Sequence, residues 1–129
     1  MSTLKVNTIQ NTSAAHSSTP EEIAQGRAKV WVSFNGTGTV AIRDSFNTSS
    51  ITDNGTGLFQ VNFSSALSNT NFCVSGMGGD AEVQFGAYMI DLSPGSSHQR
   101  TTSSVQVFTS SSQSLLDVSF NSVVVFGDQ

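Results

Sequence analysis

Apolar and polar residues alternate more regularly along residues 26–63 than anywhere else in the chain. Because successive side chains of a β-strand point to opposite faces, this period of two predicts strands with one face committed to a core. The core-facing positions of the first and last of these strands are Val30, Val32 and Phe34, then Phe59, Val61 and Phe63.

Two glycine-containing clusters divide this stretch. Residues 35–38 read NGTG and residues 53–57 read DNGTG, and both clusters are rich in residues that tolerate the positive φ angles of hairpin turns. Val40 and Ile42 resume the alternation after the first cluster. The stretch therefore predicts a meander of antiparallel strands.

The second half of the chain repeats the strand pattern with longer polar interruptions. Further strands are expected at 72–74, 83–90, 105–107, 116–120 and 123–126, with the first of them ending at the glycines of 76–79. Loops are expected at 64–71, 93–104 and 109–114. About seven or eight short strands at this spacing predict an all-β fold, a small antiparallel β-sandwich or barrel-like domain.

The first 25 residues differ from the rest because they hold too few apolar side chains to form a core. An isolated extended segment cannot offset its own ordering entropy, so it is either a frayed terminus or docked on another protein. We predict an attachment arm at 1–25 and a β domain at 26–129. The expected docking residues of the arm are Leu4, Lys5, Val6, Asn7, Thr8, Ile9 and Gln10.

A short helix is expected at the end of this arm, over Pro20–Gln25. Thr19 can cap it, proline suits the first helical position, and Glu22 can complete a capping box. Gly26 is placed to end the helix. We expect Ile23 to pack against a partner.

Composition narrows the class of protein. A chain of 129 residues fits one domain with a short appendage. Only 11% of the residues are charged and the net charge is −4, with the basic residues scattered, so we expect no nucleic-acid partner and no insertion into membranes. No apolar run approaches the length of a membrane span or a signal peptide, so we expect synthesis in a cytoplasm.

Metal and cofactor chemistry is not indicated. His16 and His98 stand apart in polar segments, and Cys73 lies between Phe72 and an apolar neighbour, which favours a buried or half-buried thiol. Asp80 with Glu82 lacks the ligand series of a recognised calcium loop. We expect no metal and no cofactor.

Catalytic motifs are likewise missing from the sequence. Glycan cleavage needs two convergent carboxylates, whereas the acidic residues mostly occupy turns or outward strand positions, among them Asp44, Asp53, Asp91 and Asp117. The glycine clusters are not followed by a helix with a Lys-Ser/Thr pair, so they are not phosphate cradles. We expect no enzyme and no catalytic residues.

The segment GRAKVWVSFNGTGTVAIRDSFNTSSITDNGTGLFQVNF, residues 26–63, resembles a segment recurrent in tail-fibre and other virion structural proteins of tailed phages, especially those infecting cyanobacteria. The opening STLKVNTIQNTS is similar to the short leader of many such fibre proteins. The resemblance covers roughly the first half of the chain and includes no catalytic motif. It implies a virion protein, at a tail fibre or the particle surface, that binds without turnover.

Two competing functions remain open. A capsid decoration protein also needs a docking arm and a small β domain, and a carbohydrate-binding module would use exposed aromatic side chains. A host-surface glycan is accordingly one expected partner, besides another virion protein that binds residues 1–25.

Threefold assembly is implied by the same resemblance, since fibre proteins of this kind are homotrimers. The expected subunit interface consists of apolar residues outside the core rows, namely Trp31, Tyr88, Ile90 and Val124. The polar loop expected at 93–104 is the expected host-receptor contact. Its candidate residues are Ser96, Ser97, His98, Gln99 and Arg100.

Overall fold

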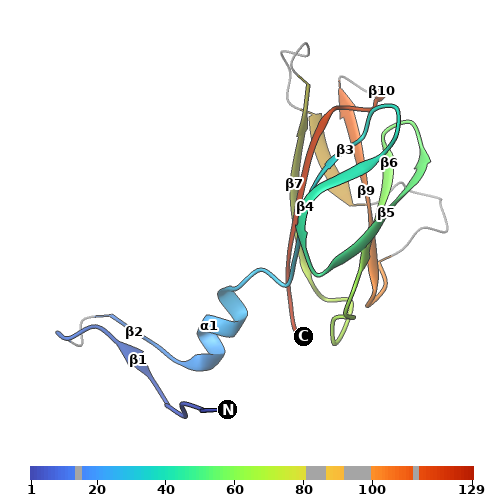
Figure 1. Ribbon diagram of the computed structural model, residues 1–129. Coiled ribbons are helices and arrows are strands. Elements are labelled where there is room, and N and C mark those ends of the chain that lie inside the picture. Colours follow the sequence, from blue (N-terminus) through green and yellow to red (C-terminus); the bar gives the residue numbers. More distant parts are fainter. Residues whose placement is uncertain (14–15, 81–86, 92–99, 112–113) are drawn as a thin grey trace.

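The computed structural model describes residues 1–13, 16–80, 87–91, 100–111 and 114–129, with the backbone alone at 87–91 and at Ser111. An N-terminal arm projects from one end of a β domain (Figure 1). The elements of the arm are β1 (Ile9–Gln10), β2 (Ser17–Ser18) and α1 (Pro20–Gly26). The strands of the domain are β3 (Val30–Asn35), β4 (Ala41–Phe46), β5 (Thr48–Gly55), β6 (Leu58–Phe63), β7 (Cys73–Gly79), β8 (Ala87–Asp91), β9 (Ser104–Ser111), β10 (Ser114–Leu115) and β11 (Phe120–Phe126).

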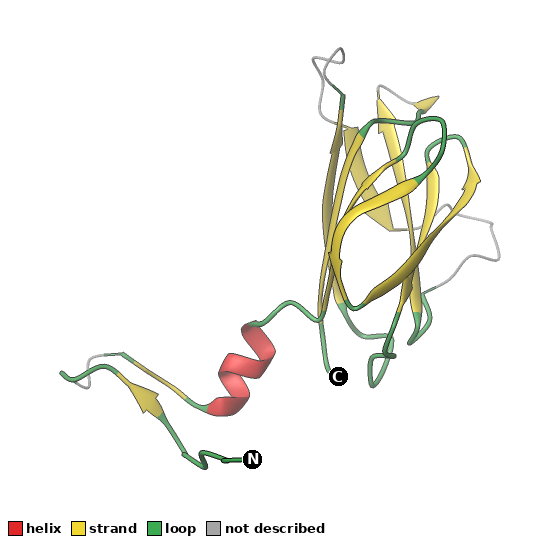
Figure 2. Ribbon diagram, viewed as in Figure 1, coloured by secondary structure: helices red, strands yellow, loops and turns green. Residues whose placement is uncertain are grey.

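All strand pairs in the described part of the domain are antiparallel, in the order β4-β3-β11-β7-β8-β9-β6-β5, with the short β10 on β9. The two end strands, β4 and β5, are consecutive in the chain and meet at Asn47, whose φ is 54°. The Asn47 side chain fixes this corner by donating to the carbonyls of Lys29 and Ser65, each at 3.1 Å. The order thus bends round into a barrel-like domain (Figure 2), as expected from the strand pattern.

The core lies between the two halves of this barrel. Val30, Val32 and Phe34 from β3 are buried and face the buried Phe59 and Val61 of β6. The rings of Phe34 and Phe59 pack edge to face with centroids 5.2 Å apart, a geometry that aromatic pairs prefer. The core rows predicted from the alternation are therefore confirmed.

Both predicted turns of the first half are also confirmed. Residues 36–40 connect β3 to β4, and β5 meets β6 through the second glycine cluster. Gly38, Gly55 and Gly57 have φ angles of 61°, 129° and 65°. Ile42 is an exception to the predicted alternation because it is exposed near the start of β4, beside a β-bulge.

The helix prediction is confirmed within one residue. The Thr19 hydroxyl accepts from the backbone NH of Glu22 at 3.1 Å, and the Glu22 carboxylate accepts from the backbone NH of Thr19 at 2.7 Å. This is the predicted capping box. The helix ends at Gly26, but the chain leaves through an extended Arg27 without a left-handed residue.

Two expectations about β7 were wrong. The strand does not end at its glycines, because β11 pairs with it along its whole length, from Cys73 to Gly79. Cys73 itself is exposed and not buried. Its neighbours Phe72 and Val74 take the inward positions of the alternation, so the thiol points outwards.

Two assignments near the C-terminus were also wrong. Residues 109–111 belong to β9, and Thr109 is fully buried, with its hydroxyl donating to the carbonyl of Leu116 at 2.6 Å. The segment 116–119 is not a strand. Val118 lies in the core, whereas Phe120 opens β11 and is exposed.

Candidate assembly surfaces

The arm exposes every apolar side chain that the sequence singled out for docking. Leu4 is 84% exposed and Ile9 53%, and Val6 is also exposed. The polar docking candidates Lys5, Asn7, Thr8 and Gln10 are exposed as well. Instead of a single extended segment, the arm contains a hairpin in which Ile9 pairs with Ser18 and Gln10 with Ser17.

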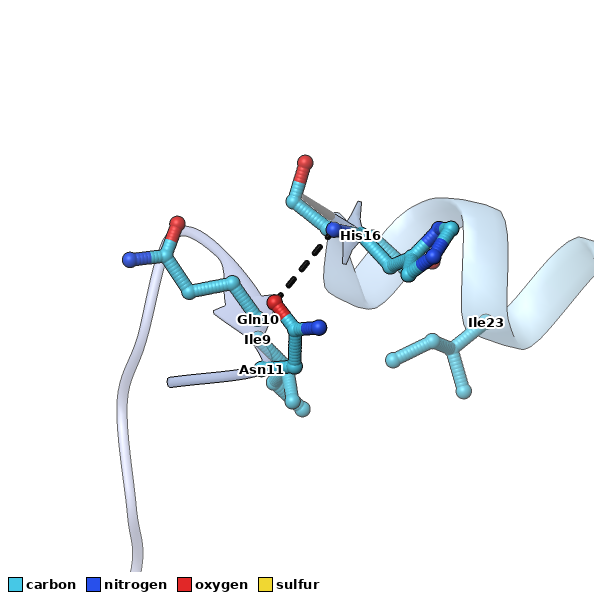
Figure 3. A pocket seen from close by; sticks show the side chains of 7 residues that line it. Ile9, Gln10, Asn11, His16 and Ile23 are labelled. Atoms are coloured by element: carbon cyan, nitrogen blue, oxygen red, sulfur yellow. Dashed lines mark hydrogen bonds between the residues drawn. The ribbon is translucent and has the colours of Figure 1, made fainter. Parts of the chain in front are cut away.

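An open hollow of about 730 Å³ lies between this hairpin and α1 (Figure 3). Ile23 points from α1 toward the hairpin, and Ile9 and His16 also line the hollow. The side-chain carbonyl oxygen of Asn11 accepts from the backbone NH of His16 at 3.4 Å and holds the hairpin turn. Ile23, which the sequence predicted to pack against a partner, therefore lies beside Ile9 among the exposed apolar residues of the arm.

The arm is connected to the domain by two side-chain hydrogen bonds near the end of α1. The ammonium group of Lys29 donates to the carbonyl of Ala24 at 2.8 Å, and Lys29 is only 5% exposed. The amide of Gln25 donates to the carboxylate of Asp128 at 3.0 Å. A cation on the last carbonyls of a helix is favoured by the helix dipole, so Lys29 orients α1 on the domain.

The outer face of strands β4, β3, β11 and β7, called the apolar face below, carries large apolar side chains separated by serines. Trp31 lies beside Phe46 on one side and Val124 on the other in the strand register. Met77, Phe120 and Phe126 are exposed on the same face. Sequence reasoning identified Trp31 and Val124 for this surface. The side chains of Tyr88 and Ile90 lie outside the described residues.

A hollow of about 420 Å³ lies in the middle of this face. Its walls include Trp31, Met77 and Val124, and the small side chains of serine residues leave the space between them. The serines are Ser33, Ser75 and Ser122. The register supports this arrangement because Ser122 is paired with both Ser33 and Met77.

The outer face of β5 and β6 is polar. The side-chain amide of Asn62 donates to the hydroxyls of Ser50 and Thr52, at 3.1 and 2.9 Å, and its carbonyl oxygen accepts from Gln60 at 3.0 Å. Gln106 of β9 lies next to Gln60 in the register but is only 5% exposed, so the water-facing part of this surface belongs to β5 and β6. The two halves of the barrel thus present outer faces of opposite character.

Of the receptor-contact candidates, Ser96, Ser97, His98 and Gln99 lie outside the described residues. Arg100 is half-buried, donates to the carbonyl of Phe72 at 2.7 Å and lies 5.2 Å above the centre of that ring. The guanidinium group of Arg100 is therefore held against Phe72.

Several acidic side chains in the described part of the chain accept hydrogen bonds from backbone NH groups. The carboxylates of Asp44, Asp53 and Asp117 accept from the backbone NH groups of Ser45, Gly55 and Gly57, at 2.8, 3.0 and 2.6 Å. Asp80 accepts from the hydroxyl of Ser119 at 3.1 Å, and Glu82 lies outside the described residues. Within residues 1–13, 16–80, 100–111 and 114–129, no three metal-ligating side chains come together.

Comparison of the chain with models of protein families, with curated proteins and with solved structures finds no significant match. None of the helices in the described residues is long and apolar enough to cross a membrane.

Four residues of the apolar face were missed by sequence reasoning, namely Phe46, Met77, Phe120 and Phe126. Phe46 lies in a polar stretch of the sequence. Only the pairing of β3 with β4, which sets Phe46 opposite Trp31, shows that it belongs to this face. Phe120 shares the sequence alternation of Val118, but Val118 precedes β11 and Phe120 is its first residue. For Met77, the signal was present in the alternation with Cys73 and Ser75 but was obscured by the glycines.

Proposed function

We propose that the chain is a virion structural protein of a tailed phage, a tail-fibre or fibre-like component that residues 1–25 attach to another virion protein. The resemblance of residues 2–13 and 26–63 to such proteins supports this class of function. The protein is made in the host cytoplasm and resides on the particle. Its mechanism is binding without turnover.

The observation that carries the proposal is the contrast between the arm and the domain. The domain buries most of its inward side chains, with Val30, Phe34 and Phe59 at zero exposure. The arm leaves Leu4, Val6, Ile9 and Ile23 exposed and projects away from the domain (Figure 1). Exposed apolar side chains on a short hairpin gain stability only when a partner covers them.

Attachment to a particle also needs a defined exit angle for the domain. The bonds from Lys29 to Ala24 and from Gln25 to Asp128 join the arm to the domain near the end of α1. Loss of a buried ammonium partner is costly, so this junction resists bending. The arm therefore acts as a docking element that holds the domain in one orientation.

The proposal includes a homotrimer, with contacts between copies at exposed apolar residues such as Trp31 and at Val124. It also includes contact between the domain and the host surface, with residues 96–100 as the candidates named from the sequence. A glycan array probed with the full chain tests the host contact, and failure to bind any glycan removes a carbohydrate receptor from the proposal.

The attachment role is tested by deleting residues 1–18 and measuring the copy number in purified particles. The deletion is expected to abolish incorporation and to leave the thermal unfolding of the domain nearly unchanged, because both junction bonds lie outside the deleted residues. Incorporation at normal copy number would overturn the attachment role.

A matched pair of point variants separates docking from a general effect of charge. Ile9→Asp places a carboxylate on the apolar side of the hairpin, and Thr12→Asp places one at its exposed turn. The proposal predicts that incorporation falls at least tenfold for Ile9→Asp and less than twofold for Thr12→Asp. Equal effects of the two variants would contradict docking through the apolar side chains.

A further inference from the structure

The two outer faces of the domain differ in a way that folding alone does not require. On β3, β4, β7 and β11 the exposed positions include Trp31, Phe46 and Met77, of which Met77 is 71% exposed. Phe120 and Phe126 continue the same face on β11, with Phe120 57% exposed. The corresponding positions of β5 and β6 carry hydroxyls and amides that bond to one another. Of these two faces, the first exposes large apolar side chains and the second is suited to water.

The size of this apolar face matches the centre of a protein interface. The exposed fractions of Trp31, Phe46, Phe120 and Phe126 together equal slightly less than two complete aromatic residues, or about 350 Å² at roughly 200 Å² each. Met77 and Val124 extend it. A specific interface buries roughly 800 Å² on each partner, with an apolar centre and a polar rim. The aromatic residues therefore supply close to half of the area that one partner contributes.

Charge favours a second copy of the same chain as the occupant. Copies arranged about a rotation axis repeat the same face around that axis, so a face carrying one sign of charge would repel itself in a trimer. The sequences of β3, β7 and β11 contain no charged residue. The marginal strand β4 carries one charge of each sign: Arg43 lies 4.6 Å above the centre of the Phe120 ring, and Asp44 pairs with Ser33 in the register.

We propose that a second copy of the chain covers this face and inserts an exposed aromatic side chain into the hollow between Trp31 and Met77. The hollow, about 420 Å³, is wide enough for such a ring because serines form its floor. Aromatic anchors in central pockets dominate interface energetics. The inference rests on the self-association in the proposed function but is independent of any particle, and it assigns the polar face of β5 and β6 to solvent.

The self-association of the full chain is tested by sedimentation equilibrium between about 1 and 100 µM, a range that brackets an interface of roughly micromolar affinity. The expected species is a multiple of the 13.6 kDa chain. Met77→Arg and, on the floor of the hollow, Ser122→Arg are expected to raise the dissociation constant at least a hundredfold. Thr52→Arg, at an exposed position of β5, is the matched control and is expected to leave it within threefold.

Cys73 provides a second readout because it is exposed on this face and pairs with Phe126 in the register. Alkylation of the thiol by iodoacetamide is expected to be at least tenfold slower in the assembled chain than in Met77→Arg. Circular dichroism confirms that each variant compared is folded, and Ser122→Arg replaces Met77→Arg if the latter is not.

Three results would overturn the inference. They are a monomer at every concentration, equal dissociation by Thr52→Arg and Met77→Arg, or rapid alkylation of Cys73 in the assembled chain. The attachment role is judged separately, because deletion of residues 1–18 is expected to leave this self-association unchanged.

Discussion

Replacing Gly57 by alanine tests the packing of the turn that joins β5 to β6. Gly57 has a φ of 65°, and a Cβ atom there would lie 2.5 Å from the carbonyl oxygen of Thr109 and 2.8 Å from the backbone nitrogen of Leu116. Gly38 is a suitable control because its φ is 61° and no atom lies within 4 Å of the place that a Cβ atom would take. The two sites therefore share the backbone strain and differ in the space available.

The strain alone costs about 1–2 kcal/mol at either site. At Gly57, a clash with fixed backbone adds about 1–3 kcal/mol. Relief of the clash would also disturb two hydrogen bonds, from the Gly57 NH to the Asp117 carboxylate at 2.6 Å and from the Thr109 NH to the Gly57 carbonyl at 2.8 Å. A bond to a charged group contributes about 1.5–3 kcal/mol. The lower bounds of the clash and of the bond to the carboxylate add to about 2.5 kcal/mol, and we expect Gly57→Ala to lose about this much more than Gly38→Ala.

The free energy of unfolding of both variants is measured by urea denaturation at one fixed protein concentration, since self-association would otherwise contribute. Similar losses for the two variants would refute the close packing of Gly57 against the Thr109 and Leu116 backbone. A large loss of unfolding free energy for Gly38→Ala alone would refute the conclusion that the turn between β3 and β4 leaves space beside Gly38.

Three further outcomes are expected. Val32→Asp should prevent folding because it buries an unpaired charge in the core, whereas Thr52→Asp on the exposed side of β5 should fold normally; circular dichroism distinguishes the two. Thr19→Ala should destabilise α1 by about 1 kcal/mol through loss of its cap, seen as reduced helical chemical shifts at Glu22 by NMR, with no change in domain melting. Lys29→Met should remove the bond to Ala24 and broaden the distribution of spin-label distances between arm and domain; an unchanged distribution would show that Lys29 does not orient α1.

The strands that the sequence identified best are those with one buried and one exposed face. Val30, Val32 and Phe34 stood out because the period of two survives wherever a strand has a single buried side. β5 was not anticipated as a strand, because its residues are mostly polar and it lies at the end of the sheet order. Such a strand is held by backbone pairing, which leaves little trace in the hydrophobic pattern.

Other elements depended on contacts between distant residues. Thr109 looked like part of a polar loop, but its hydroxyl is satisfied in the interior by the carbonyl of Leu116, a contact that the hydrophobic pattern does not reveal. The glycines of β7 looked like an end, but β11 pairs with them along the whole strand. The full extent of the apolar face was not predicted for a similar reason, since Phe46 and Trp31 become neighbours only through the β3–β4 register. Helix α1 was predicted well because its capping box is local in sequence.

The most direct test of the proposed virion role is a reconstruction of the particles of the encoding phage with this chain labelled, for instance by a fused tag at Gln129. The proposal predicts label on the particle in threefold groups, at the tail fibres, with the β domain held away from the surface by the arm. Label on the capsid shell would instead favour a decoration protein. Purified infectious particles that contain none of this chain would contradict the account.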